Sequence, residues 1–62
     1  MTTIDLGIAN SWDEEEMELF RRLDAFVRSK PLNTLVSTEE NGATKYTRSS
    51  KSVSIKWEVH YD

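Results

Sequence analysis

The spacing of apolar and polar residues changes along this chain of 62 residues. Between residues 11 and 30 the apolar positions recur every three or four residues, which predicts an amphipathic helix. The apolar arc of this helix is formed by Trp12, Leu19, Phe20, Leu23, Phe26 and Val27. We expect the arc to pack against the rest of the protein, with charged residues on the opposite side in contact with solvent.

Both ends of this helix carry sequence signals. Ser11 is followed three residues later by Glu14, a spacing that predicts a capping box at the start. Acidic residues crowd the first turn and basic residues follow, as the helix dipole favours. Pro31 disfavours helical geometry at Lys30, so the helix is predicted to end there.

After Pro31 the apolar residues alternate with polar ones, which predicts β-strands. The clearest strand is residues 53–61, and Asn41-Gly42 is a strong signal for a type I′ hairpin turn between strands at 32–39 and 43–48. Residues 32–61 are therefore predicted to form a β-meander. Residues 1–10 also alternate and are predicted to form a further strand or an extended arm.

The predicted fold is α+β, with one amphipathic helix packed on a three- or four-stranded antiparallel sheet in the order (β)αβββ. We expect residues 1–62 to form a single small domain. A domain of this size buries only ~60% of the surface that its unfolded chain exposes. The chain has no cysteine, so neither disulfides nor a thiolate metal site can stabilise so small a core.

One charged residue, Glu16, falls inside the predicted apolar arc. The first turn of the helix can overhang the sheet and leave Glu16 in solvent at the edge of the core. Alternatively, Glu16 pairs with a strand base such as Arg48 or Lys56, or it is retained for a partner. A buried, unpaired carboxylate is excluded by its desolvation cost.

Composition does not favour an enzyme. His60 is the single histidine, there are only two glycines, and adjacent carboxylates on a helix point about 100° apart instead of converging. We therefore expect no catalysis, no cofactor and no metal site. No apolar run reaches the ~18 residues of a membrane span, and the N-terminus lacks the features of a signal peptide, so a cytoplasmic protein is expected.

Charge is separated along the chain. Residues 1–20 carry six acidic residues and no base, whereas residues 41–57 carry four bases and no acid, within a net charge of −3. The acidic segment predicts a surface that docks on a basic partner protein, as in a small modulator or inhibitor, for which size and charge suggest a phage-type protein. Its candidate protein-binding residues are Trp12, Asp13, Glu15, Glu16, Met17 and Glu18.

Two alternatives remain open. Bases interleaved with an aromatic residue favour weak nucleic-acid binding through Lys45, Tyr46, Arg48, Lys51 and Lys56, although the acidic balance of the chain counts against it. The other alternative is a self-assembling subunit. If the C-terminal strand lies at an open sheet edge, two copies can pair there as a homodimer.

Overall fold

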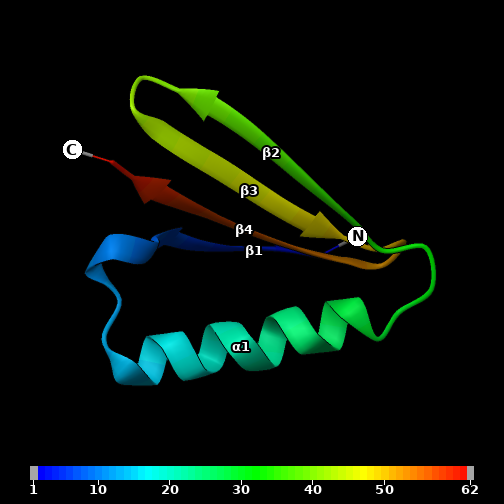
Figure 1. The fold of residues 1–62 in the computed structure, drawn as a ribbon. Coiled ribbons are helices and arrows are strands. Elements are labelled where there is room, and N and C mark those ends of the chain that lie inside the picture. The colour runs from blue at the N-terminus through cyan, green and yellow to red at the C-terminus, as the bar shows by residue number, and fades with distance from the viewer. Residues whose placement is uncertain (1, 62) are drawn as a thin grey trace.

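The computed structural model describes residues 2–61, which form an α+β fold with one α-helix beside a four-stranded sheet (Figure 1). The elements in chain order are β1 (Thr2–Ile8), the 3-10 helix η1 (Ala9–Ser11), α1 (Glu14–Arg28), β2 (Thr34–Glu40), β3 (Ala43–Ser49) and β4 (Val53–His60). The predicted class and the order βαβββ are confirmed, and the N-terminal segment is a strand.

The strands lie side by side in the order β1-β4-β3-β2. β2 to β4 form the predicted antiparallel meander, but β1 pairs with β4 in parallel, so the prediction of a wholly antiparallel sheet is wrong. The reason is the helix, which returns the chain to the end of the sheet where β1 began (Figure 1). β2 therefore runs in the same direction as β1. β4 follows β2 after two hairpin turns and so runs in that direction as well.

The hairpin between β2 and β3 turns at Asn41 and Gly42, with φ of 50° and 78°. These positive values confirm the predicted type I′ turn, whose twist matches that of the flanking strands. The pairing then runs without interruption from Glu40 opposite Ala43 to Thr34 opposite Ser49.

The helix begins later than predicted and is capped by different residues. Asp13 is the N-cap and forms a capping box with Glu16, while Ser11 lies in η1 and donates its hydroxyl to the Ile8 carbonyl at 2.9 Å. The proposed Ser11–Glu14 box is therefore wrong. The 3-10 turn after β1 occupies residues 9–11, so the helix cannot form until the chain has passed it. The helix ends at Arg28, two residues before the predicted end.

The core lies between α1 and the two central strands, β3 and β4. Val27 from α1 and Ile55 from β4 are completely buried. Beside them, Phe20 packs between two tryptophans, with ring centroids 5.0 Å from Trp12 and 4.7 Å from Trp57. Trp57 also stacks on Tyr46 at 5.4 Å, so it belongs to the core as the alternating pattern predicts.

The apolar arc of the helix is only partly covered. Leu19 and Phe26 are each 50% exposed, so the expectation that all six arc residues pack inward is wrong for these two. They lie at one margin of the arc, about 80° and 100° around the helix from Val27 at 100° per residue. Within residues 2–61, no helix is long and apolar enough to cross a membrane.

Candidate functional site

The start of α1, where the sequence predicts a protein-binding surface, uses two of its acids to cap the helix. The Glu16 N–H donates to Asp13 Oδ1 at 2.9 Å, and the Asp13 N–H donates to Glu16 Oε1 at 3.3 Å. Both side chains are exposed. Glu16 therefore lies in solvent at the edge of the core, as the first of the three explanations expects, and its carboxylate has a local structural role.

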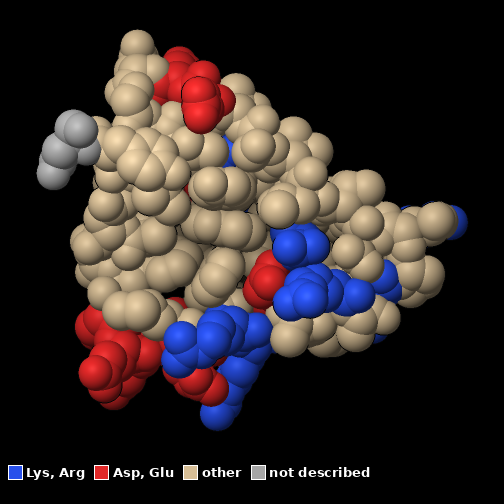
Figure 2. Space-filling view, viewed as in Figure 1, with Lys and Arg blue, Asp and Glu red and all other residues tan. Residues whose placement is uncertain are grey.

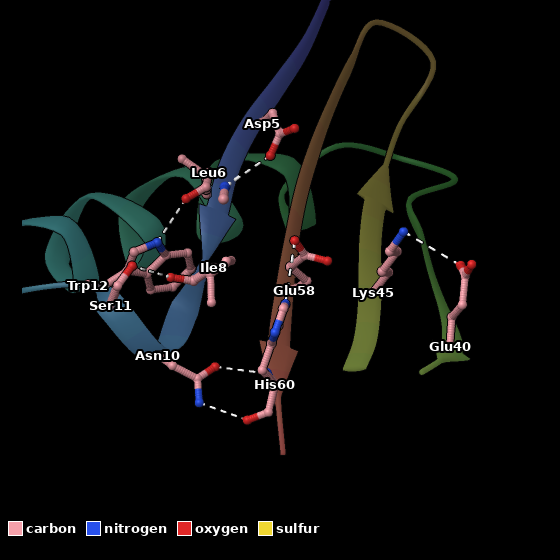
Figure 3. A network of polar contacts seen from close by, with 11 residues as sticks. Asp5, Leu6, Ile8, Asn10, Ser11, Trp12, Glu40, Lys45, Glu58 and His60 are labelled. Carbon is pink, nitrogen blue, oxygen red and sulfur yellow. Dashed lines mark hydrogen bonds and ion pairs between the residues drawn. The ribbon is translucent and has the colours of Figure 1, made fainter. Parts of the chain in front are cut away.

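Trp12 attaches this end of the helix to the sheet. Its indole N–H donates to the carbonyl of Leu6 in β1 at 2.8 Å (Figure 3). Its ring packs on Phe20. Nearby, the side-chain amide of Asn10 exchanges two hydrogen bonds of 2.8 Å with the backbone of His60 at the end of β4. Trp12 is thus half-buried, and its hydrogen-bonding group is already used within the protein.

Glu18 is paired along the helix. Its carboxylate accepts from Arg21 at 2.8 Å and from Arg22 at 3.3 Å. The hydrogen bond from Arg21, with the charges of both guanidinium groups, lowers the pKa of Glu18 below its usual value. These two ion pairs partly neutralise Glu18 and make it a weaker contact for a basic partner.

Two acids of the first turn remain unpaired. Glu14 and Glu15 are exposed, and among residues 2–61 neither forms an ion pair or a side-chain hydrogen bond. Met17 is 41% exposed but lies about 160° around the helix from Glu15, on the side towards Asp24 and β3. Met17 and Glu15 therefore lie on different sides of α1.

Two residues of the apolar arc that the sequence assigned to the core, Leu19 and Phe26, are exposed on the surface of α1 instead. Leu19 and Phe26 are seven residues apart and so lie on the same side of α1, together with Glu15. Leu19 borders a shallow hollow of about 330 Å³ that is also lined by Glu14, Glu15, Glu18 and Arg22. We call Glu15, Leu19 and Phe26 the α1 stripe. Leu19 and Phe26 can be recognised in the sequence by their position at the margin of the predicted apolar arc.

Charge is grouped at the surface in the same part of the molecule. Figure 2 shows acidic side chains gathered at the start of α1, with basic side chains beside them further along the helix. At the other end of the stripe, the Lys30 ammonium lies 4.6 Å from the centre of the Phe26 ring. The stripe thus has an acidic end and an apolar remainder, with the base Lys30 beside its apolar end.

The residues of the nucleic-acid alternative are divided between the two faces of the sheet. Tyr46 and Arg48 lie on the face covered by α1, where Tyr46 stacks on Trp57 and Arg48 pairs with Asp24. Strand alternation places Lys45 and Lys56 on the opposite face. Lys51 is exposed in the turn between β3 and β4.

Acidic neighbours balance the two lysines on the open face of the sheet. Lys45 lies 3.6 Å from Glu40 and is opposite Glu58 in the register, while Lys56 is opposite Asp5 (Figure 3 shows the Lys45–Glu40 pair). The hollow that they line is only about 150 Å³. The block of four bases in the sequence therefore becomes an alternating surface of both signs, without the basic groove that follows a phosphate backbone.

Candidate catalytic or metal-binding groups do not converge. His60 is exposed and its Nε2 lies 3.6 Å from Glu58. Over residues 2–61, no three His, Asp or Glu side chains lie close enough to hold a metal ion. Comparisons of the chain with protein families, with curated proteins and with solved structures found no match.

Proposed function

We propose that this protein is a non-enzymatic protein-binding module, a small acidic modulator or inhibitor that docks on another protein through α1. The observation that carries the proposal is the α1 stripe, where half-exposed Leu19 lines a hollow together with the unpaired carboxylates of Glu14 and Glu15. Half-exposed Phe26 continues the apolar surface two turns further along the same side of the helix. The partner that fits this surface has a basic patch beside an apolar depression.

The apolar part of the stripe supports binding on energetic grounds. Burying a leucine or phenylalanine side chain contributes about 1.5–3 kcal/mol, and this chain has few large residues to bury. Leu19 and Phe26 are nevertheless each half exposed, whereas among residues 2–61 the only large side chains that are completely enclosed are those of Val27 and Ile55. A partner that covers Leu19 and Phe26 gains the free energy of burying them, which the isolated protein does not gain.

The charges next to the stripe support a protein partner of opposite sign. Glu14 and Glu15 lie at the N-terminal end of α1, and no base of the described residues neutralises them. Unpaired charges at the rim of an interface steer a complementary partner and accelerate association. Leu19 and Phe26 then supply the desolvated centre that holds the complex together.

A binding function also agrees with the shape of the molecule. The hollow beside Leu19 is wide and shallow, and the hollow on the open face of the sheet is smaller than the ~300–1,000 Å³ typical of small-molecule sites. Among the acids that line these two hollows, Glu18 pairs with arginines, Asp5 accepts from the Gly7 N–H, and Glu58 lies 3.6 Å from His60. Glu14 and Glu15 are unpaired, and as neighbours on a helix they point about 100° apart. This arrangement supports docking on a macromolecule more than chemistry on a small substrate.

The test is affinity capture of the tagged protein from a lysate of the organism that encodes it, after nuclease treatment. We compare the natural chain with a Leu19→Ser, Phe26→Ser double variant and with an E14K, E15K double variant. One retained protein should be lost or weakened at least about tenfold by either change, which is ~1.4 kcal/mol.

The matched control is a Met17→Ser, Leu35→Ser double variant, because these residues are 41% and 48% exposed but lie away from the stripe. This control should retain the partner as well as the natural chain does. The proposal is wrong if the partner survives both stripe variants, or if every partner disappears on nuclease treatment.

A further inference from the structure

Within residues 2–61, no strand neighbours the outer edge of β2, since β2 ends the sheet order. All seven of its residues, Thr34–Glu40, are exposed, and its pairing with β3 is regular along the whole length. A straight, exposed edge of this kind presents a row of unpaired backbone N–H and C=O groups. β2 is therefore ready to pair with another extended segment.

The turn geometry indicates which groups point outward. In a two-residue type I′ hairpin the flanking residues, here Glu40 and Ala43, form a hydrogen-bonded pair, and such pairs alternate along an antiparallel ladder. The backbone groups of Thr34, Val36, Thr38 and Glu40 are thus directed at β3. Those of Leu35, Ser37 and Glu39 are directed at the open edge.

The opposite edge of the sheet is less suited to pairing. β1 has an irregularity between Asp5 and Ile8, where Gly7 adopts φ of 75°. The Gly7 N–H is already taken up by Asp5 Oδ1 at 2.9 Å. Such a bulge twists an edge strand and interrupts its row of free groups. Of the two edges, β2 alone is regular.

The β2 edge also carries unusual apolar exposure. Leu35 and Val36 are 48% and 57% exposed on opposite faces of the strand, and Leu32 just before it is 74% exposed. Because α1 packs over β3 and β4, β2 is the strand farthest from the helix in Figure 1. An added strand would cover Leu35 and Val36 on both faces at once.

We propose that a second copy of this chain pairs with β2 edge to edge, in an antiparallel dimer whose two-fold axis passes through Ser37. This register uses every outward-directed group of both strands. It places Leu35 opposite Glu39 of the second copy and Val36 opposite its Thr38. The two sheets join into one of eight strands, with both helices on the same face.

Charge selects this antiparallel pairing of identical strands. The acidic end of β2, Glu39 and Glu40, lies opposite Leu35 and Thr34 of the second copy, so no like charges face each other. A parallel pairing in register would set the acids of both copies side by side, which is destabilising. Each copy of β2 thus contributes both an acidic end and the uncharged end that lies opposite it, as a two-fold contact requires.

The interface is small. One strand pair with two apolar side chains per copy covers less than the ~1,600 Å² of a standard interface, so the dimer should dissociate on dilution. Sedimentation equilibrium from about 10 μM to about 1 mM should show the mean mass rising from that of the monomer towards twice that value. A monomer throughout this range overturns the proposal.

A proline at the axis tests the edge itself. Ser37→Pro removes an outward N–H but no hydrogen bond to β3, and proline is tolerated on edge strands. This variant should remain monomeric with an unchanged circular dichroism spectrum, whereas the control Ser37→Thr, which keeps the N–H, should still associate. A folded Ser37→Pro variant that still forms dimers overturns the proposal.

Amide hydrogen exchange on the natural chain gives an independent readout if the proline variant fails to fold. Exchange at Leu35, Ser37 and Glu39 should slow as concentration rises, while exchange along β1 should not change. Concentration-dependent protection on β1 or α1 instead of β2 would contradict the pairing. The α1 stripe takes no part in this interface, so its variants should leave the dimer intact.

Discussion

At the scale of single residues, the contact that ties the helix to the sheet is between Asp24 and Arg48. The Arg48 guanidinium donates to the Asp24 carboxylate, and the two side chains are only 18% and 15% exposed. The sequence suggested a tether from Arg48 to Glu16, but Asp24, two turns later, provides it. Arg28 also approaches Asp24, at 3.9 Å, from the solvent side of the helix.

Removing the Asp24 charge should therefore be costly. We expect Asp24→Asn to lower the free energy of unfolding by about 2 kcal/mol, because Arg48 loses a charge-assisted hydrogen bond in a largely enclosed position. Urea denaturation followed by tryptophan fluorescence measures this change. Arg28→Gln is the control, and its exposed pair should be worth no more than about 0.5 kcal/mol. Equal effects of the two variants would show that Asp24–Arg48 is no stronger than a surface pair.

At the scale of elements, α1 is defined by side chains at both of its ends. The Asp13–Glu16 box satisfies backbone N–H groups at the start, and the Asn33 amide donates to the carbonyls of Arg28 and Lys30 at 3.0 and 2.7 Å at the end. Helix termini otherwise leave such groups without partners. A helix of 15 residues would be only marginally stable in isolation, so its caps and its packing must act together.

The location of the N-cap gives a test at this scale. Asp13→Ala should lower the free energy of unfolding by about 1 kcal/mol, the usual cost of losing a cap. Ser11→Ala should have a smaller effect, because the Ser11 hydroxyl bonds to Ile8 in an exposed turn outside the helix. Thermal denaturation followed by circular dichroism compares the two variants. A larger loss for Ser11→Ala would restore Ser11 as the cap.

At the scale of the whole molecule, the core is limited. Val27 and Ile55 are fully enclosed, and a row of aromatic rings runs beside them from Trp12 through Phe20 and Trp57 to Tyr46. The open face of the sheet and the margin of α1 remain in solvent. Because few side chains are buried, parts of the surface remain available to partners. Each buried side chain therefore contributes a large share of the stability.

Shortening Ile55 should have a large effect on so small a core. We expect Ile55→Ala to lower the free energy of unfolding by about 3 kcal/mol, from lost burial and the cavity that remains. Domains of this size have only ~5 kcal/mol or somewhat more in total, so a fraction of the variant should be unfolded at 25 °C. Leu32→Ala, at a residue that is 74% exposed, should change stability by less than about 0.5 kcal/mol.

The sequence by itself determined the features that depend on neighbouring residues. The helical period, the Asn41-Gly42 turn and the alternation of β4 all appear in the structure because local backbone preferences and side-chain direction decide them. The helix also ends before Pro31, although it does so at Arg28, two residues earlier than predicted. The true N-cap was also readable, since Asp13 and Glu16 have the same capping-box spacing as Ser11 and Glu14. Choosing between the two boxes required the 3-10 turn that precedes the helix.

The tertiary structure alone decided the features that depend on distant contacts. β4 lies between β1 and β3, so the expectation of an open edge at the C-terminal strand is wrong, and β2 is open instead. The same packing leaves Leu19 and Phe26 exposed, turns Trp12 inward and separates Lys45 from Arg48. Strand order and helix rotation are set by how α1 covers the central strands, and periodicity in the sequence contains no information about that contact.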